Sequence, residues 1–436
     1  MSNLDELRTR VRGRVLLEGD EGFEQARRPW NLAVEQPVSA VVEAADADDV
    51  AALVRYAREA GLTVSAQPNG HGASGAVEGV VLLRTGALDE VRVDAGARTA
   101  RVGAGVSWGR VQAEAAKHGL TGLPGSSPVV SVTGYTLGGG LSWFGRRHGW
   151  AADGVTAFEV VDARGERVRV TAASDPDLFW ALCGAGGDFA LVTAIEFDLY
   201  PAPALYGGRL VWPGARAPQV MEAFGRITAG APEELTLWLD LFQFPGGDPL
   251  VAVDVTYLGE EDKGRELLRP LEGAGVLLSD TRGVLELTGL GAITAEPTDP
   301  SAGLARAELL TGLGQEVIDA LVAEPIAPLL SVQIRHLGGA LAGPSQGPFG
   351  PLGEPYSLYM FGVPFTPEVA QGVRARQRGL AESLAPHVSG RKPYTYLAPG
   401  ESVASAFGAE ELERLRRIKR ERDPSGVFRS NYPVLG

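Results

Sequence analysis

His71 is the residue of this sequence whose type and setting most directly suggest chemistry. It is one of five histidines and stands between two glycines in the segment PNGHG, residues 68–72. A short apolar run ends just before this segment, so the imidazole is predicted to lie on a turn that follows a strand. A histidine in such a place is either an exposed loop residue or a functional group with bare backbone on both sides. The pattern alone leaves both interpretations open.

The glycines of the chain are concentrated in four blocks, at residues 68–75, 102–105, 134–140 and 183–187. Glycine-rich turns let backbone amides approach a flat or phosphorylated ligand closely, although a loop-rich surface would have the same composition. None of the blocks is the G-x-G-x-x-G motif of a nicotinamide-binding Rossmann domain, because Trp108 follows Gly103 and Gly105 where a third glycine is required. A Rossmann domain is therefore disfavoured.

Several other chemistries lack the residues that they need. The nucleophile motif Gly-x-Ser-x-Gly is absent, which disfavours an α/β-hydrolase. No HExxH, His-x-His or carboxylate cluster accompanies His71, so no metal site is predicted. The one cysteine, Cys183, excludes an intramolecular disulfide. It follows an apolar segment with no lysine or arginine nearby, and we expect a buried, inert thiol.

The elements that position the glycine blocks can be followed from residue 38 onward. A helix is expected to begin after Asp46, with Val50, Leu53 and Val54 on its apolar face, and to end at Gly61. A further helix follows residues 174–177, which resemble a capping box with a proline in the first turn. Strands are predicted at 38–42, 63–65, 80–83, 91–94, 99–103 and 191–199, and another helix from 107 toward 119.

The character of the sequence changes between about residues 204 and 390. Longer strands are predicted at 235–241, 250–257, 329–335 and 356–363, with helices at 264–271 and 315–322 between them. This pattern indicates an α+β unit with a largely antiparallel sheet. A last helix at 410–422 ends before Pro424.

Length and charge limit the classes of function. The chain has 436 residues and a net charge of −14, from 40 basic and 54 acidic residues. The length indicates two or three domains, and the acidic balance argues against a general affinity for nucleic acid or anionic membranes. No run approaches the roughly 20 apolar residues of a membrane span. The first residues lack the apolar core of a secretion signal, so a cytoplasmic location is expected.

Taken in order, five segments resemble the berberine-bridge-enzyme-like flavoproteins, whose FAD-binding domain is of the vanillyl-alcohol-oxidase (PCMH) type. The segments are residues 68–72, 102–111, 124–149, 175–201 and 417–433. The similarity runs from about Pro37 to the C-terminus. It implies an α+β fold with a two-part FAD-binding domain, residues 1–200 with the segment 391–436 returning to it. Between them, residues 201–390 would form a substrate-binding domain with a mainly antiparallel sheet covered by helices.

The resemblance implies FAD as the cofactor. The loop from Gln67 to Gly72 would wrap its pyrophosphate with backbone amides. His71 matches the histidine that family members commonly join to the 8α-methyl group of the flavin. The cofactor contacts implied in this way are Gln67, Pro68, Asn69, Gly70, His71, Gly72, Gly125, Ser127, Val130, Val132, Gly134, Gly138, Gly187, Asp188, Val192, Asn431 and Tyr432.

The sequence departs from the family pattern at several of these positions. Many members have a cysteine bonded to the flavin where this chain has Ser127, so we expect one covalent link, through His71. Val130 occupies a position that influences access of dioxygen, and valine there is compatible with an oxidase. Cys183, Asp188 and Ala190 stand where Arg, Asn and Gly are more frequent, and the aspartate changes the local charge.

The catalytic residues are less easily identified. Transfer of a hydride to a flavin requires a base that takes the hydroxyl proton of the substrate. The resemblance suggests Tyr394 or Tyr396, although the asparagine of the family motif is missing there. Strand alternation places Gln333 and Arg335 on one face. Gln333 can only form hydrogen bonds, whereas Arg335 could hold an anionic substrate or the reduced flavin; both could instead serve the sheet or a domain interface.

The predicted function is that of an FAD-dependent oxidase that acts on an alcohol, a sugar or a specialised metabolite and returns the electrons to O2 as H2O2. The alternatives are a flavin-dependent monooxygenase or oxidative cyclase, and a ligand-binding protein without redox activity. The expected partners are a small-molecule substrate and O2, with neither nucleic acid nor membrane. The sequence indicates neither the substrate nor the oligomeric state.

Overall fold

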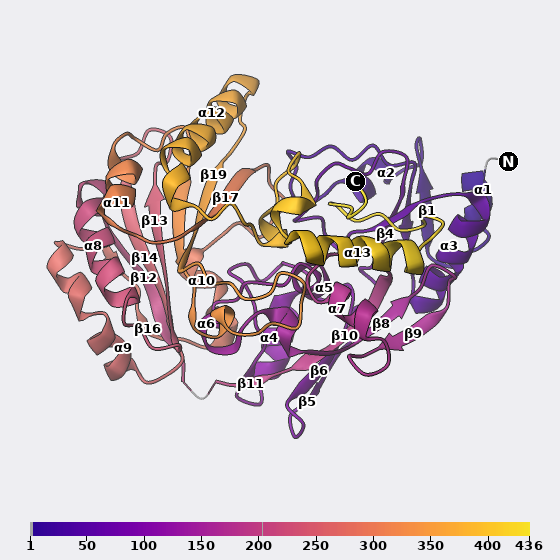
Figure 1. Cartoon of the computed structure of the whole chain (residues 1–436), viewed down its shortest axis with the longest axis horizontal. Coiled ribbons are helices and arrows are strands. Elements are labelled where there is room, and N and C mark those ends of the chain that lie inside the picture. The colour runs from indigo at the N-terminus through magenta and orange to yellow at the C-terminus, as the bar shows by residue number, and fades with distance from the viewer. Residues whose placement is uncertain (1–2, 203) are drawn as a thin grey trace.

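The computed structural model of the chain describes residues 3–202 and 204–436 (Figure 1). It contains two smaller sheets on one side and one large sheet on the other. The elements that follow the large sheet return to the smaller ones through α13 (Ala409–Arg422). We call the two parts the two-sheet unit, formed by elements β1 to β11 together with α13, and the large-sheet unit, formed by elements β12 to α12.

The first small sheet carries the glycine loop that contains His71. Its strand order is β1 (Arg14–Leu17), β2 (Ala40–Glu43), β4 (Val81–Arg84) and β3 (Val64–Ala66), with β2 and β3 parallel to β4. The predicted helix between β2 and β3 is confirmed as α3 (Ala47–Ala60): Asp46 accepts hydrogen bonds from the amides of Asp48 and Asp49, and Gly61 ends the helix at φ 67°. The helices α1 (Asn3–Leu7) and α2 (Phe23–Arg27) precede this sheet's second strand.

The second small sheet is antiparallel throughout, and three of its five strands, β5, β6 and β10, were predicted from the sequence. Its order is β5 (Val91–Asp94), β6 (Thr99–Gly103), β10 (Leu191–Asp198), β8 (Val155–Val161) and β9 (Arg167–Val170). A short pair, β7 (Leu120–Thr121) and β11 (Tyr200–Pro201), lies outside it. The helices that accompany it are α4 (Trp108–Ala116), α5 (Val132–Leu137), α6 (Gly145–His148) and α7 (Pro176–Leu182).

The large sheet is antiparallel in every pairing, which confirms the predicted α+β unit. Its order is β15 (Ser279–Asp280), β12 (Tyr206–Pro213), β14 (Leu250–Tyr257), β13 (Leu235–Phe242), β18 (Ser331–His336), β19 (Tyr356–Gly362) and β17 (Leu304–Leu310), and β16 (Gly283–Val284) also pairs with β12. The helices of this unit are α8 (Ala217–Thr228), α9 (Glu261–Leu267), α10 (Gly291–Thr294), α11 (Gln315–Val322) and α12 (Pro367–Ser383).

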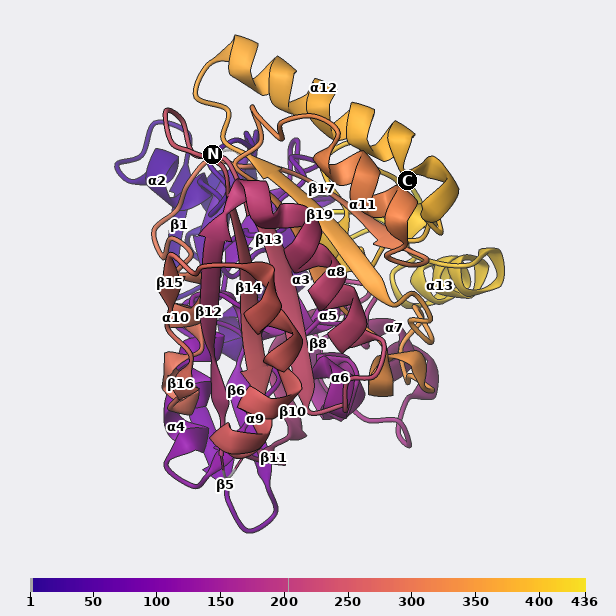
Figure 2. The same cartoon turned by 90° about the vertical axis from the view of Figure 1, so that its left-hand side faces the viewer.

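The two faces of the large sheet have different partners. On one face, Leu237 and Leu239 belong to a buried cluster with Phe224 of α8, Ile318 of α11 and Val373 of α12. On the other face, Trp238 belongs to the main cluster of the two-sheet unit. Figures 1 and 2 show α8 and α11 on the outer side of the sheet, away from the two-sheet unit. The inner face therefore borders any site that lies between the units.

The structure differs from several of the predicted element boundaries, and two of the differences have a clear physical reason. The helix expected at 264–271 is α9, which ends at Leu267 and is followed by a 3-10 segment from Arg269 to Ala274. Pro270 has no amide hydrogen and cannot continue the α-helical ladder. The strand expected from residue 329 begins at Ser331, because the amide of Leu329 instead donates to the Ile326 carbonyl in a turn.

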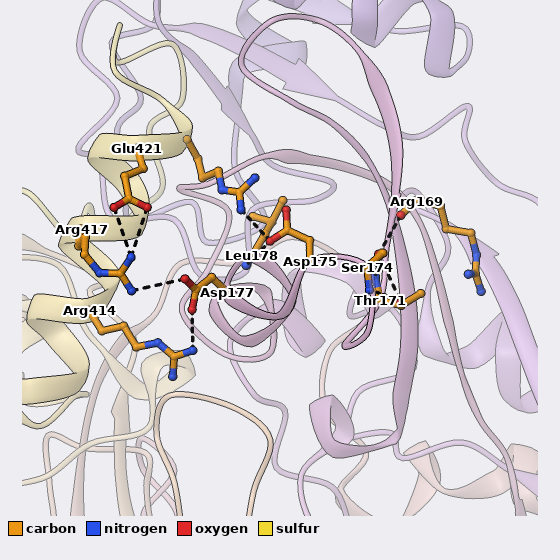
Figure 3. A network of polar contacts seen from close by, with 10 residues as sticks. Arg169, Thr171, Ser174, Asp175, Asp177, Leu178, Arg414, Arg417 and Glu421 are labelled. Carbon is orange, nitrogen blue, oxygen red and sulfur yellow. Dashed lines mark hydrogen bonds and ion pairs between the residues drawn. The ribbon is translucent and has the colours of Figure 1, made fainter.

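The C-terminal segment, residues 391–436, which we call the return segment, is held on the two-sheet unit by charged contacts between α13 and α7 (Figure 3). Asp177 accepts hydrogen bonds from Arg414 at 2.7 Å and from Arg417 at 3.4 Å. The Arg414 guanidinium also lies 3.9 Å from the ring centroid of Trp180. These contacts aim residues 423–434 back toward the glycine loop. Among the described residues, no helix is both long and apolar enough to span a membrane.

Candidate active site

A cavity lies where the glycine loop, helix α5, the turn before β10 and the return segment meet. It has about 600 Å³ of empty space, including its open mouth. Five of the predicted cofactor contacts line it, and so does Tyr394: the five are Pro68, Gly134, Gly187, Val192 and Asn431. The structure thus brings together residues that are separated by more than 360 positions in the sequence.

His71 lies in the loop beside this cavity and is stacked on an indole ring. The ring centroids of His71 and Trp30 are 4.3 Å apart, at an interplanar angle of 16°. Burial lowers the pKa of His71 to about 4, so the imidazole is neutral at pH 7. Neither ring nitrogen has a hydrogen-bond partner within residues 3–202 and 204–436. The imidazole is therefore held in place by stacking, with both nitrogens buried and without a partner in the described residues.

The loop requires glycine at position 70. Gly70 has φ +78°, and a Cβ atom there would lie 2.8 Å from the Pro29 side chain. The residues on either side are anchored: Asn69 donates a 2.8 Å hydrogen bond to the Val129 carbonyl, and Gln67 donates one of 3.0 Å to Asn431 Oδ1. These two hydrogen bonds join the loop to the segment after residue 124 and to the return segment, around the cavity.

Asp188 holds the return segment and does not line the cavity. Its fully buried carboxylate accepts hydrogen bonds from the amides of Ser430 and Val434, both at 3.0 Å. Lys419 donates to the Asp188 carbonyl at 2.6 Å and to Asp423 at 2.8 Å. The sequence interpretation placed Asp188 beside the cofactor. In the structure both of its carboxylate oxygens accept hydrogen bonds from backbone amides of the return segment, and its contact with the cofactor stays a prediction.

The two tyrosines of the family motif lie in different surroundings. Tyr394 lines the cavity, and burial raises its pKa. Its ring meets that of Tyr432 edge-on at 5.7 Å, and the Tyr432 hydroxyl donates a 2.6 Å hydrogen bond to the Leu397 carbonyl. Tyr432 therefore supports Tyr394. Tyr396 lies apart, and its hydroxyl oxygen is 3.3 Å from Arg335 Nη1 and 3.4 Å from Ser357 Oγ.

The segment from Gly125 to Gly138 forms a wall beside the loop. Ser127 is buried, and its hydroxyl has no partner among the described residues. Val130 accepts a 2.9 Å hydrogen bond from the amide of Trp108, and Val132 begins α5. A Cβ atom at Gly138 would lie 2.4 Å from the Thr395 side chain, whereas at Gly125 it would contact the ring of Tyr135 at 3.4 Å. Gly138 thus permits the return segment to approach α5.

Gln333 and Arg335 lie on the inner face of the large sheet. Gln333 Nε2 donates to the two oxygens of Asp240, at 3.0 and 3.1 Å, and its Oε1 accepts a hydrogen bond from Arg335 Nε. The Arg335 guanidinium lies 4.0 Å from the ring centroid of Trp238. Within the described residues no carboxylate forms an ion pair with Arg335. It is a cation surrounded by aromatic rings and available to an anion.

Sequence reasoning missed several residues that the structure adds to the site. Trp30 precedes the first predicted strand and belongs to no recognised motif. Arg429 lines the cavity with a cationic side chain for which the described chain provides no ion pair. Asp240 and Asp254 were detectable, because each interrupts an otherwise apolar strand, and a carboxylate in such a strand is unusual unless it has a partner. Their partners are on other strands and could not be read from the sequence.

The residues around the cavity fit an elongated ligand with a polar part. Thr85 and Thr133 line it with hydroxyls that have no partner in the described parts of the chain. At Gly134 and Gly187 a Cβ atom would meet nothing within 4 Å, so the backbone there is accessible. Unused donors, bare backbone and the Arg429 cation are what a dinucleotide with a pyrophosphate requires.

Comparisons with known proteins agree with this fit. The family model described as "FAD binding domain" matches residues 38–171, and "Berberine and berberine like" matches residues 394–434. The (R)-6-hydroxynicotine oxidase of Paenarthrobacter nicotinovorans is 29% identical, over 97% of each chain. The FAD-dependent monooxygenase tpcD of Cochliobolus heterostrophus is 27% identical, over 88% of this chain and 82% of its own.

The fold is shared with solved structures as well. The berberine bridge enzyme of Eschscholzia californica superimposes with a TM-score of 0.85, covering 99% of this chain and 98% of that one, at 19% identity. The two family matches, 38–171 and 394–434, contain most of the residues that line the cavity; the others lie at 186–192. The chain is an FAD-linked oxidoreductase that contains an FAD-binding domain and a berberine-like C-terminal segment.

Proposed function

We propose that the protein is an FAD-dependent oxidase of a small organic molecule, with one covalent link from His71 to the flavin and dioxygen as the electron acceptor. Bound FAD would supply the acceptor for a hydride from the substrate. The observation that carries the proposal is the imidazole of His71. It is neutral, fixed by Trp30 and unbonded at both nitrogens beside the cavity. A histidine that joins a flavin must be unprotonated at the attacking nitrogen.

Several groups of this chain support a cofactor in the cavity. Arg429 supplies a cation for the pyrophosphate, and the accessible backbone at Gly134 and Gly187 allows close approach. Ser127 has no sulfur with which to form a second link. The clamp of Asp188 on Ser430 and Val434 keeps Asn431 at the cavity wall.

For the base we propose Tyr396 in preference to Tyr394. The Tyr394 side chain is packed within the core, against the ring of Tyr432 and the backbone of Gly186. The oxygen of Tyr396 accepts a hydrogen bond from Arg335, so its own hydrogen must point elsewhere. The position next to Trp238 and Tyr359 lies on the inner face of the large sheet, where a substrate between the two units would be. Arg335 would hold an anionic group of that substrate or the negative charge of the reduced flavin.

The covalent link is tested by the visible spectrum of the purified protein before and after acid precipitation. We expect the yellow colour to remain with the precipitate in the wild type and to pass into the supernatant in His71→Ala. Colour that leaves the wild-type precipitate contradicts the link, and a colourless protein that also fails to take up FAD contradicts the oxidase. His118→Ala, at an exposed histidine, is the matched control.

The electron acceptor is tested with a peroxidase-coupled assay on alcohols, oligosaccharides and cyclic amines; the cyclic amines are included because of the name of the nicotine-oxidising relative. An oxidase releases one H2O2 for each substrate oxidised. The second candidate is a monooxygenase, which the name of the Cochliobolus relative favours. It would incorporate an oxygen atom from 18O2 into the product and release less than one H2O2 per turnover.

A further inference from the structure

A row of polar side chains crosses four neighbouring strands of the large sheet and ends at Tyr396. Arg209 on β12 forms two hydrogen bonds with Asp254 on β14, at 2.5 and 2.7 Å. Asp254 is next to Asp240 on β13, and Asp240 accepts from Gln333 on β18. Figure 2 shows β12, β14 and β13 side by side on the sheet. The row is continuous from a buried ion pair to the candidate site.

Two carboxyl groups lie side by side in this row, and their burial and mutual repulsion favour a proton on one of them. Burial, and then the neighbouring charge of Asp254, raise the pKa of Asp240 well above its ordinary value. The pKa of Asp254 is also raised by burial, but the ion pair with Arg209 opposes the shift. Asp254 is therefore the charged partner of Arg209, and Asp240 is the neutral acid that donates to it. No negative charge from this pair is left for Arg335.

The amide of Gln333 has two orientations, and Asp240 selects between them. With the amino group on Asp240, the carbonyl oxygen faces Arg335 Nε and accepts its hydrogen. In the flipped orientation two donors would face each other. Asp240 makes no hydrogen bond with Arg335. By fixing the orientation of the Gln333 amide, it nevertheless determines how the guanidinium is held.

We propose that Asp240 is a positioning residue: through the Gln333 amide it holds the Arg335 guanidinium against Trp238 and Tyr396, where the cation serves as the anion-recognition group of the active site. The inference rests on the proposed role of Arg335. Asp240 itself touches neither Arg335 nor Tyr396 in the hydrogen-bond row, and its contribution is the orientation of the side chain that does.

The substitutions Asp240→Asn and Asp240→Ala should have different effects on the row. Asn in this position retains an oxygen that accepts from Gln333 and gains an amino group that donates to Asp254, as the neutral acid does. Asp240→Asn should therefore preserve the row. Asp240→Ala removes the acceptor, and Gln333→Leu breaks the same link from the other side. Thr236→Val, on the same strand, is the control for changes in the sheet.

The experiment is a titration of the FAD-loaded proteins with sulfite, a small anion whose binding bleaches the visible band of oxidised flavin. We expect Arg335→Gln, Asp240→Ala and Gln333→Leu to raise the dissociation constant of sulfite roughly tenfold each, the equivalent of one hydrogen bond to a charged group. Asp240→Asn and Thr236→Val should change it less than about threefold. Combining Asp240→Ala with Arg335→Gln should add nothing to Arg335→Gln alone.

The possible failures are distinguishable. If Arg335→Gln leaves the affinity unchanged, the role of Arg335 is wrong and the role of Asp240 is wrong with it. If Arg335→Gln weakens the binding of sulfite but Gln333→Leu and Asp240→Ala do not, only the positioning role of Asp240 is wrong. If Asp240→Asn weakens sulfite binding as much as Asp240→Ala does, the negative charge of Asp240 is required, and the inference that Asp240 is a neutral acid is refuted. Should Asp240→Ala fail to fold, Gln333→Leu and Asp240→Asn still decide the question.

Discussion

Replacement of Asp188 by alanine should loosen the return segment and cause the protein to lose its cofactor. The substitution removes two hydrogen bonds between a carboxylate and the amides of Ser430 and Val434, each worth about 1.5–3 kcal/mol. Lys419 loses a charge at 3.6 Å but keeps Asp423 at 2.8 Å. We therefore expect a loss of about 4 kcal/mol, at the level of breaking a buried polar network. At ~2 °C per kcal/mol for a unit of this size, Tm would fall by about 8 °C.

The assay is thermal unfolding of the FAD-loaded protein, followed by both tryptophan fluorescence and the fluorescence of released flavin. Flavin should be released first, since Asn431 lines the cavity and is carried by the segment that Asp188 clamps. Asp94→Ala is the matched control: that exposed carboxylate also accepts one backbone hydrogen bond, from Ala97 at 2.9 Å, and its loss should cost less than about 1 kcal/mol. Equal shifts in the two variants would refute the clamp.

Three further predictions concern groups outside the clamp. Burial lowers the pKa of His148 to about 4, so the unfolded chain binds the proton more tightly and the wild type loses stability as the pH falls below 6.5. In urea unfolding at pH 5, His148→Gln should recover about 1 kcal/mol of that loss, since the partly exposed ring is screened by solvent. Arg146→Met removes donors to the carbonyl groups of Leu235 and Leu337 across the two units and should lower the urea midpoint by the equivalent of about 3 kcal/mol, whereas Arg147→Met, at an exposed neighbour, should not. Gly186→Ala should reduce the FAD content per mole of purified protein, because the residue has φ +81° and its Cβ atom would lie 2.4 Å from the Tyr394 hydroxyl, while Gly230→Ala, where nothing lies within 4 Å, should not.

The local part of the fold could be predicted because its signals are local. Asp46 and Gly61 define the ends of α3, and the alternation of β14 and β13 identifies them as strands. The boundaries of α9 were wrong because the break depends on Pro270 within an otherwise helical pattern. Strands β8, β9, β12 and β17 and the helices α8 and α12 received no prediction. The two helices could have been recognised, because Val220, Phe224 and Ile227 form an apolar face on α8, and Thr366 with Pro367 marks the start of α12.

The same distinction between local and long-range signals applies to the residues of the candidate site. The loop around His71 and the segment around Asn431 were found through motifs, and the structure joins them by the hydrogen bond from Gln67. The direction of the Asp188 side chain was not predictable, because it depends on a segment 240 residues away in the sequence. The contact of Arg335 with Tyr396 arises from the packing of the return segment against the inner face of the large sheet, which no local pattern encodes.

The hydrogen bond between Gln67 and Asn431 has a consequence for how the protein is made. During translation, residues 38–192 emerge from the ribosome long before residues 430–434, and until then one wall of the cavity is missing. We therefore expect FAD to be retained only after residues 430–434 have completed the cavity, so that truncated translation products would be colourless.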